Sequence, residues 1–508
     1  MPSSCYDWLD RLDYVSRDFA AVLRSIPLGT PLWLNDVMGC LFQSCTSRRL
    51  VYACLVLLPI AYAALLAGCG TIPDAEALLH TNPLYLVSPQ FVGPDGPLTA
   101  RQANRVILRL KQRQELPSDI LQRHIAFEQA LTNVPLALDN KVTLLQNGAT
   151  AYRAMLEAIH GATSSINLET YIFSDGLVGN TFADALIERQ RHGVQVNVIY
   201  DAFGSIGTPA GFFDRMRGNG ITVLEYRPLN PFETTLHWSP NHRNHRKMMI
   251  VDGSIAFTGG INISEDYASG FGSNTTQTPL EYWRDTDVEI EGPAVAQFQH
   301  IFIDDWVHQK GPLLAPRNYF PKLKAKGNDI VRVIASVPER FNPIYVTLIS
   351  AIANAQTNVY ITDAYFAPDH QMLRALARAA RRGVDVRLLL PSQSDVPIVV
   401  SAQRSHYTRL LKAGVRIYEW QGKMLHAKTA TIDGVWSTVG TSNLDWWSIA
   451  RDNEVNAVIL SHKFADDMNM MFANDLEDAS QITLGQWAHR GLCERLYETA
   501  GRIIQPLL

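Results

Sequence analysis

Cysteine is scarce outside the first part of this chain of 508 residues. Five of its six cysteines fall within the first 69 residues, and the remainder of the chain holds only Cys493. A single cysteine cannot build a disulfide framework. With 508 residues, of which 47% are hydrophobic, the chain is long and apolar enough for two or three domains with cores of their own. The sequence therefore predicts a globular protein without structural disulfides.

Excess positive charge is also missing. The formal net charge is -4 at pH 7, so the chain as a whole has no attraction for polyphosphate. A protein that binds nucleic acid without regard to sequence needs that attraction. We therefore expect no nucleic-acid partner, and a nuclease or another phosphodiesterase with a local basic patch stays open only as a minor alternative.

What the chain does contain is one pattern of five residues that occurs twice at identical spacing. A histidine is followed in turn by lysine, aspartate, glycine and asparagine. The two copies are His245, Lys247, Asp252, Gly259 and Asn262, and His426, Lys428, Asp433, Gly440 and Asn443. If each residue type occupies roughly one position in twenty, five matches arise by chance about once in three million starting points. The second copy therefore indicates an internal repeat.

Each copy predicts a β-hairpin. Asp252-Gly253 and Asp433-Gly434 separate pairs of apolar, partly β-branched runs, a pattern typical of a tight turn between two strands. The histidine and lysine of each copy, two residues apart, then point to the same face of their strand. The aspartates have two interpretations, a role in the turn and a direct role in chemistry.

This set of side chains suits cleavage of a phosphate diester. One imidazole can attack phosphorus while the lysines and asparagine amides neutralise the non-bridging oxygens. The second imidazole can protonate the departing alcohol. We therefore expect no metal and no cofactor.

The doubled pattern resembles the phospholipase D superfamily, whose active site forms where two such motifs meet and works through a covalent phosphohistidine. Residues 290–293, 363–368 and 426–445 are similar to the bacterial cardiolipin synthase branch, and the resemblance covers roughly residues 140–508. Where relatives often carry arginine, this chain has Trp446 and Trp447, which leaves the choice of headgroup open. The two tryptophans either line a slot for acyl chains or belong to the core.

The resemblance implies a role for each site residue. The implied catalytic residues are His245, Lys247, Asp252, His426, Lys428 and Asp433. The implied phosphate-binding residues are Lys247, Asn262, Lys428 and Asn443. Asp285 and Glu454 stand where the family places a carboxylate that orients each histidine. Because the family generally uses the first copy in this way, His245 is expected to be the nucleophile and His426 the general acid.

Strands and helices are predicted to alternate in the same order in both halves of this region. In the first half, strands at 142–145, 166–173, 194–200 and 221–226 are separated by helices at 151–160, 180–192 and 209–217. In the second half, strands at 331–334, 359–366, 384–390 and 415–420 accompany helices near 344–355 and 370–382. We therefore predict an α/β fold of two homologous sandwich halves with the active site at their interface.

The predicted domain organisation has five parts. They are a leader at 1–69, a helical segment at 70–140, a first half at 141–310, a linker at 311–328 and a second half at 329–508. The basic helix expected at 99–115 either contacts anionic headgroups or forms a solvated face. The segment at 227–244 is either a loop over the active site or an ordinary surface loop. Residues 464–508 are expected to be helical.

The leader resembles a lipoprotein signal. Arg48 and Arg49 precede an apolar run at 50–67, and the run ends in Leu-Ala-Gly-Cys at residues 66–69. A charged start, an apolar middle and a finish of small residues describe a secretory signal, and its cysteine predicts lipidation at Cys69. The alternative is an uncleaved transmembrane helix. Either would attach the protein to a membrane, and we expect the periplasmic face.

The functional hypothesis is a membrane-attached phosphatidyltransferase that makes cardiolipin. The expected donor is phosphatidylglycerol, with phosphatidylethanolamine as a second candidate, and the phosphatidyl group passes through a histidine. A hydrolytic phospholipase D would use the same residues and deliver water in place of the alcohol. A non-enzymatic membrane scaffold is a third reading, but it would have no reason to keep both motifs complete. The sequence leaves the oligomeric state open.

Overall fold

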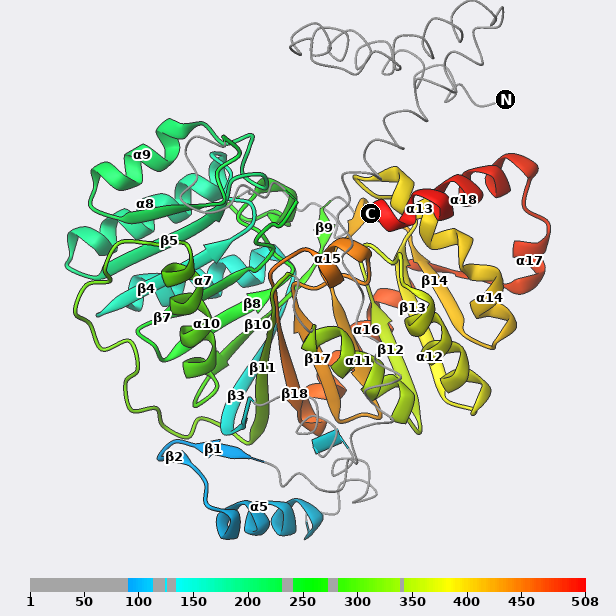
Figure 1. Ribbon diagram of the computed structural model, residues 1–508, viewed down its shortest axis with the longest axis horizontal. Coiled ribbons are helices and arrows are strands. Elements are labelled where there is room, and N and C mark those ends of the chain that lie inside the picture. The colour runs from blue at the N-terminus through cyan, green and yellow to red at the C-terminus, as the bar shows by residue number, and fades with distance from the viewer. Residues whose placement is uncertain (1–89, 113–123, 126–133, 231–240, 273–281, 339–341) are drawn as a thin grey trace, which may run out of the picture. The chain divides into compact units, whose positions relative to one another are not determined.

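The computed structural model describes residues 90–112, 124–125, 134–230, 241–272, 282–338 and 342–508 (Figure 1). The apolar run at 50–67, Cys69, and parts of the predicted helical segment at 70–140 and of the predicted loop at 227–244 lie outside these ranges. None of the helices within them is long and apolar enough to cross a membrane.

The described chain begins with a short hairpin and a basic helix. The elements are β1 (Phe91–Gly93), β2 (Gly96–Pro97) and α5 (Ala100–Gln112). β1 pairs with β2 and, in parallel, with the start of the next strand, so this segment extends the main sheet.

Strands and helices alternate in the first half, as predicted. The strands are β3 (Leu136–Gln146), β4 (Ser165–Thr170), β5 (Gln195–Asp201), β6 (Thr222–Tyr226), β7 (Met248–Val251), β8 (Ile255–Gly259), β9 (Trp283–Arg284) and β10 (Thr286–Glu291). The helices are α7 (Gly148–Gly161), α8 (Leu177–Arg191), α9 (Ala210–Gly218), the short 3₁₀ helix η2 (Glu265–Tyr267) and α10 (Val295–His308).

The second half repeats this order. Its strands are β11 (Asp329–Ser336), β12 (Asn358–Thr362), β13 (Asp385–Pro391), β14 (Arg416–Trp420), β15 (Met424–Leu425), β16 (Thr429–Ile432), β17 (Trp436–Gly440), β18 (Glu454–Leu460) and β19 (Ala479–Ile482). Its helices are α11 (Pro343–Asn354), α12 (His370–Arg381), α13 (Pro397–Ser405), α14 (Tyr407–Lys412), α15 (Trp446–Ala450), α16 (His462–Glu477), α17 (Leu484–Ala488), α18 (Leu492–Ile504) and η4 (Gln505–Leu507). The predicted helical end is thus interrupted by β19, which pairs with β14.

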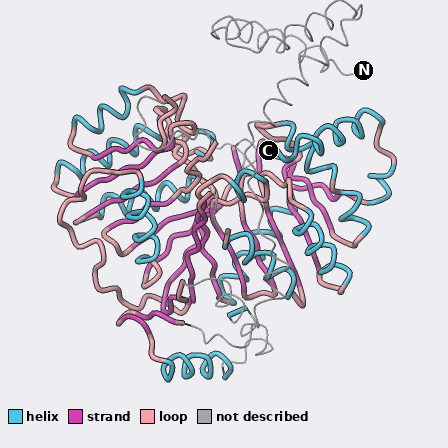
Figure 2. Tube along the Cα trace, viewed as in Figure 1, coloured by secondary structure: helices cyan, strands magenta, loops and turns pink. Residues whose placement is uncertain are grey.

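The strands of both halves, except β9 and β15, which pair with each other, join one hydrogen-bonded sheet (Figure 2). From one edge to the centre, the first half runs β6, β5, β4, β7, β8, β10 and β3, with the β6–β5–β4 pairs parallel and the others antiparallel. The second half runs β14, β13, β12, β16, β17, β18 and β11 with the same directions. β3 and β11 pair with each other. The predicted α/β class is confirmed, and the strand order is the same on both sides of this central pair.

β3 is the strand on which the two halves meet. Its first residues pair with β11, and its later residues, from Lys141 onward, pair with β10. Asp139, with φ 60°, marks the irregularity between the two sections. The side chain of Asn140 lies there, donates to the carbonyl of Asp329 in the second half and accepts from the backbone N–H of Ala294 in the first. This pairing explains why the strand extends beyond the 142–145 that periodicity predicts.

The hydrophobic core has three large parts, of which the middle one belongs to both halves. One cluster lies within the first half, and another combines the second half with side chains of β1, α5 and β3. The third contains Phe298, Phe302 and Trp306 of α10 together with Val455 and Ile459 of β18. Because this cluster buries side chains from both halves, the angle between the halves is fixed by packing as well as by the sheet.

The motif residues between histidine and asparagine build the two predicted hairpins, β7–β8 and β16–β17. The turn residues Asp252 and Asp433 have φ of 51° and 55°, and the following glycines have φ of 60° and 62°. Positive φ at both central residues is the signature of a type I′ turn, which matches the twist of the strands. The prediction of tight hairpins is confirmed.

The motif glycines are required by close packing at the ends of these hairpins. A Cβ on Gly259 would lie 2.1 Å from Asp287 Oδ1, and a Cβ on Gly440 would lie 2.2 Å from Asn456 Oδ1. Neither neighbour can retreat easily, because each carboxylate or amide belongs to the adjacent strand. Any larger residue would push the hairpin away from the strand beside it.

Candidate active site

The structure pairs each motif histidine with a carboxylate from the other half. His245, just before β7, lies with its Nδ1 3.0 and 3.1 Å from the two carboxylate oxygens of Glu454 at the start of β18. His426, just before β16, lies with its Nδ1 2.7 Å from Asp285 Oδ2, between β9 and β10. The site therefore cannot form within either half alone.

Backbone contacts repeat this crossed arrangement. The N–H of His245 donates to the carbonyl of Asn453 at 3.0 Å, and the N–H of His426 donates to the carbonyl of Arg284 at 2.7 Å. Short parallel pairings accompany each contact, Asn244 with Asn453 in one case and β15 with β9 in the other. Each histidine is thus held by main chain of the half that supplies its carboxylate.

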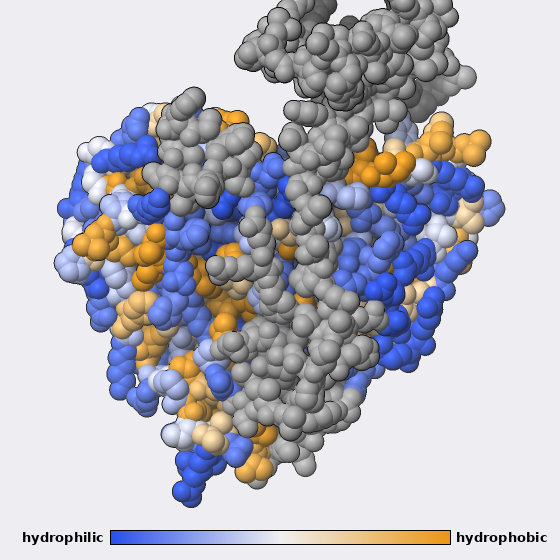
Figure 3. Space-filling view, in the orientation of Figure 1, coloured by the Kyte–Doolittle hydropathy of each residue, from blue (hydrophilic) through white to orange (hydrophobic). Residues whose placement is uncertain are grey.

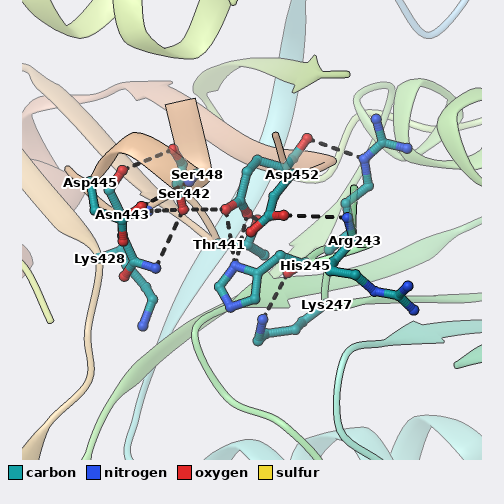
Figure 4. Close-up of polar contacts among 12 residues, drawn as sticks. Arg243, His245, Lys247, Lys428, Thr441, Ser442, Asn443, Asp445, Ser448 and Asp452 are labelled. Atoms are coloured by element: carbon teal, nitrogen blue, oxygen red, sulfur yellow. Dashed lines mark hydrogen bonds and ion pairs between the residues drawn. The ribbon is translucent and has the colours of Figure 1, made fainter. Parts of the chain in front are cut away.

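Glu454 is the centre of a hydrogen-bond network, and Figure 4 labels three of its partners, His245, Thr441 and Ser448. The hydroxyls of Thr441 and Ser448 both donate to its carboxylate, the latter at 2.5 Å. Burial alone would raise the pKa of Glu454, but the adjacent His245 and Lys247 hold it below its ordinary value. An ionised Glu454 accepts the Nδ1–H of His245, which leaves the lone pair of that imidazole on Nε2.

Burial weakens the positive charges of the site. It lowers the pKa of Lys247 to about 7, with the nearby Lys428 acting in the same direction. The pKa values of Lys428 and His245 are lowered too, again chiefly by burial. Two buried lysines whose charged forms are disfavoured by burial form a favourable place for an anion, because a bound phosphate would stabilise their charge.

The two lysines lie beside their histidines. Lys247 Nζ donates to the carbonyl of His245 at 2.7 Å. Lys428 Nζ donates to the carbonyl of His426 and lies 2.9 and 3.0 Å from the two nitrogens of its ring. The structure thus places histidine and lysine of each copy on one face, as strand alternation predicts.

The asparagines lie in the same network, each connected to the histidine of the other copy. Asn262 Nδ2 donates to the hydroxyl of Tyr267 at 2.8 Å, and that hydroxyl lies 3.4 Å from His426 Nδ1. The backbone N–H of Asn443 donates to Ser448 Oγ at 3.1 Å, which leads through Glu454 to His245. Binding of phosphate by these amides stays a prediction.

Asp252 and Asp433 do not join the histidines. Each lies at the far end of its strand, where its carboxylate accepts backbone N–H bonds from the segment before the neighbouring strand. Asp252 accepts from residues 163–165, and Asp433 from residues 356–358. This position fits the structural interpretation of the two aspartates, and it offers their carboxylates no contact with a phosphate held between the histidines.

Two tyrosines, for which the sequence predicted no role, cover the two histidines. The ring of Tyr171 lies 5.0 Å from that of His245, and Lys247 Nζ lies 5.3 Å from the same tyrosine ring. Tyr365 stands in the matching relation to the second copy, 5.8 Å from His426 and 5.7 Å from Lys428 Nζ. The sequence does hold a sign of this role, because both tyrosines follow the second strand of their half. That repeated position can be interpreted only once the contacts between distant segments are known.

Buried arginine–carboxylate ion pairs hold the chain segments that carry the site residues. Arg243, two residues before His245, binds Asp201 with Nη2 3.0 Å from Oδ1, and Arg246 binds Asp305. Arg284, next to Asp285, binds Asp475 at 2.8 Å. These pairs fix the chain on either side of the catalytic groups, and nothing in the motif spacing points to them. Within the described ranges, no cluster of three or more histidine, cysteine, aspartate or glutamate residues has the arrangement of a metal site.

Two crossed histidine–carboxylate pairs beside two buried lysines define a phosphodiester-processing site of the phospholipase D type. Comparison with known proteins agrees. Residues 155–306 and 348–476 match the family described as "Cardiolipin synthase, PLD-like domain". The chain belongs to this family, the cardiolipin synthase branch of the phospholipase D superfamily.

Individual relatives support the same assignment. The cardiolipin synthase of Alkalihalophilus pseudofirmus is 34% identical over 378 residues, 74% of this chain and 73% of that protein. The cardiolipin synthase of Geobacillus sp. strain WCH70 is 35% identical over 378 residues, 74% of each chain. The predicted enzyme class, a phosphatidyltransferase of this superfamily that acts on phospholipid, is confirmed at that level.

One solved structure shares the fold. The crystal structure of phosphatidylserine synthase from Haemophilus influenzae Rd KW20 superimposes with a TM-score of 0.59, covering 76% of this chain and 100% of that one. Its sequence identity is 13%, so the likeness concerns the fold alone.

The lowered pKa of Lys247 predicts an alkaline limit to activity. Because its pKa is about 7, the ammonium charge that the phosphate needs is lost as pH rises through that value. We expect kcat/KM, which reports the free enzyme, to fall above about pH 7, and kcat to fall at higher pH because bound phosphate stabilises the ammonium. Both profiles are measured on purified protein with a chromogenic phosphodiester.

The matched variant is Lys247→Arg, which keeps the charge to high pH. Its activity should be lower at all pH values because the guanidinium is larger. Its kcat/KM should decline less steeply above pH 7, since only the loss of the proton from Asp285, whose pKa burial raises to about 7, remains there. An equally steep decline in both proteins would show that Lys247 does not contribute to the limit.

Proposed function

We propose that this chain is a membrane-attached phosphatidyltransferase that makes cardiolipin from two molecules of phosphatidylglycerol through a phosphohistidine. The observation that carries the proposal is the pair of crossed histidines held beside two buried lysines, in a chain whose curated relatives are cardiolipin synthases. Transfer and hydrolysis share the first half of such a reaction, so they differ only in which hydroxyl enters the second half.

In the first step, His245 Nε2 attacks the phosphorus of the donor lipid. The N–P bond forms, the P–O bond to the headgroup glycerol breaks, and the glycerol oxygen takes a proton from His426. Lys247 and Lys428 bind the non-bridging oxygens, on which negative charge accumulates. Lys428 turns from the ring of His426 to the phosphate when the donor enters.

The carboxylate environments support this division of roles. Glu454, held ionised, accepts the Nδ1–H of His245, so the lone pair of the imidazole is on Nε2. Burial raises the pKa of Asp285 to about 7, so near neutrality this carboxyl retains a proton to a large extent. A protonated Asp285 donates to Nδ1 of His426, whose own proton is then on Nε2. As Nε2 passes that proton to the leaving oxygen, the proton of Asp285 moves to Nδ1, so that the imidazole stays neutral.

In the second step, His426 removes a proton from the glycerol hydroxyl of a second phosphatidylglycerol. The hydroxyl oxygen attacks phosphorus, the N–P bond breaks, and His245 is regenerated with cardiolipin as product. Water competes for the same position. Tyr171 and Tyr365 limit the space beside the histidines and reduce access for water, which favours a lipid hydroxyl held in line with phosphorus.

Trp446 and Trp447 begin α15, next to the network of Glu454. Both are half-buried, and their neighbour Asp445 caps the helix by accepting from the N–H of Ser448 at 2.8 Å. Arg451 lies over the ring of Trp447 at 5.4 Å. A half-buried position at the edge of the site favours contact with substrate over a purely internal role, and we propose that this pair faces the bound lipid.

The product test uses vesicles of phosphatidylglycerol. We expect the purified protein to release cardiolipin and glycerol in equal amounts, with phosphatidic acid as a minor product, and His245→Ala to release none of them. Products are quantified by lipid mass spectrometry and an enzymatic assay for glycerol. Phosphatidic acid as the main product would identify a hydrolase instead.

A parallel sample of vesicles that mix phosphatidylethanolamine as the donor with phosphatidylglycerol as the acceptor tests the second candidate. Release of ethanolamine together with cardiolipin would identify it as an accepted donor, and no release would restrict the donor to phosphatidylglycerol.

The histidine roles are tested by trapping the covalent intermediate. A donor with a good leaving group needs no acid, so His426→Ala should accumulate a phosphohistidine on His245, because the second step lacks its base. His245→Ala should accumulate none. The adduct is found by mass spectrometry of peptides from acid-free digestion. An adduct on residue 426 of the His245→Ala variant would reverse the assignment.

Membrane attachment is proposed to occur through Cys69, which follows the apolar run at 50–67. We expect labelled palmitate to be incorporated into the protein in bacterial cells and Cys69→Ser to remove the label, with Cys493→Ser as the matched control that keeps it. Because glycine and not aspartate follows the cysteine, we place the lipidated chain on the periplasmic face. Label that persists in Cys69→Ser would favour an uncleaved transmembrane anchor.

A further inference from the structure

The helix α18, near the C-terminus, has its apolar side turned outward. Leu492, Leu496 and Ile503, which share one face at helical spacing, are 78%, 69% and 70% exposed. The opposite face holds Glu498 and Gly501, and these are buried. A surface helix normally buries its apolar stripe, so this arrangement is the reverse of the usual one. Figure 3 shows the resulting hydrophobic patch, orange at the upper right, where Figure 1 places α18.

The inward face cannot be exchanged for the outward one. Glu498 forms an ion pair with Arg490, with the guanidinium nitrogens 2.5 and 2.9 Å from its oxygens. Gly501 lies so close to α13 that a Cβ would be 2.4 Å from the backbone nitrogen of Ala402. Rotation of the helix would drive a leucine into that contact and break the ion pair. The outward position of the leucines is therefore fixed by packing.

Cationic side chains border the apolar face. Arg495 and Arg502 are both exposed and lie seven residues apart, so they occupy the same flank of the helix. The acidic residues of the helix lie elsewhere: Glu494 accepts from the N–H of Gly491 at the helix start, and Glu498 is buried in its ion pair. An apolar face with arginines along one edge is the pattern of helices that lie in the interface of an anionic bilayer.

The end of α18 is attached to the covering of the active site. Gln505, directly after the helix, donates to the carbonyls of Ala367 and Pro368, which follow Tyr365. The terminal Leu508 accepts from the N–H of Trp447. The C-terminal end of α18 is therefore held beside the segment that covers His426.

The first half also has exposed apolar side chains beside the tyrosine that covers its histidine. Phe203 and Ile206 are 53% and 68% exposed. They lie in the loop after β5, in which Ser205 Oγ donates to the carbonyl of Tyr171, the residue that covers His245. The loop after β13, the matching strand, exposes Val396. Exposed apolar side chains thus border the covering of both histidines.

We propose that α18 lies in the surface of a phospholipid bilayer, with Leu492, Leu496 and Ile503 among the acyl chains and Arg495 and Arg502 at anionic headgroups. The contact holds the mouth of the active site at the lipid surface. A second copy of the chain fits the face less well. A 13-residue helix presents a strip about 20 Å long and about 10 Å wide, and twice that area is well below the ~1,000 Å² of a stable protein interface.

The test uses the full chain in vesicles of phosphatidylcholine and phosphatidylserine. Cys493 is exposed beside the apolar face, and its alkylation by a charged maleimide is read on the tryptic peptide of residues 491–495, separately from the other cysteines. We expect alkylation in vesicles to be at least about five times faster in Leu496→Gln/Ile503→Gln than in the wild type, because the variant no longer inserts. Equal rates would overturn the proposal.

Leu313→Gln is the matched control, since Leu313 is fully exposed away from this helix. It should behave as the wild type does, and circular dichroism melting should show that all three proteins are equally folded. A change of rate in Leu313→Gln as large as in the double variant would remove the assignment to α18.

The occupant is identified with a phosphatidylcholine that carries a diazirine on its acyl chain. After irradiation, the wild type should carry lipid adducts on peptides of residues 491–508, and Leu496→Gln/Ile503→Gln should carry few. Protection of Cys493 without adducts would contradict the proposal and indicate a protein cover. That cover would be a second copy if dilution of the protein tenfold in lipid removes the protection, and another segment of the same chain if it does not. None of these readouts needs turnover, so they stand or fall separately from the proposed reaction.

Discussion

The site depends on the exchange of carboxylates between the halves. Each histidine takes its orienting acid, and the main-chain carbonyl that anchors its backbone, from the half that does not contain it. The catalytic geometry is therefore set by the β3–β11 pairing and by the core that α10 and β18 share. A shift of one half against the other would separate both pairs at once, which explains why packing at this junction is so extensive.

Burial of charge is the second constraint. Two lysines, two histidines and their carboxylates lie almost out of contact with water, and burial lowers the pKa values of the lysines and raises that of Asp285. Such a group of charges is costly to hold without a ligand. An anionic phosphate between the lysines offsets part of that cost, so the features that make the empty site unfavourable also make it selective for phosphate.

The sequence predicted what local chemistry determines. The Asp-Gly turns, the histidine and lysine on one face and the α/β alternation depend on neighbouring residues, and the structure agrees with each. The crossing of Glu454 and Asp285, the covering by Tyr171 and Tyr365, and the length of β3 depend on contacts between segments more than 60 residues apart, about which spacing says nothing. The position of Asp252 and Asp433 was open in the sequence, and their backbone contacts decide it in favour of a structural role. The outward position of the apolar face of α18 could not be predicted, because a helical pattern in the sequence does not show which face packs against the protein.

The near-symmetry of the site raises the question of how two similar histidines could take the different roles proposed for them. Their carboxylates differ in length and in surroundings. Glu454 accepts from two hydroxyls as well as from His245, which stabilises its charge. Asp285 accepts from the backbone N–H of Thr286 at 2.7 Å but has no hydroxyl donors among its described contacts, and burial dominates its pKa. The carboxylate that keeps its charge favours a nucleophilic partner, and the one that keeps a proton favours an acid. Two hydroxyls on one side of the site thus suffice to break its symmetry.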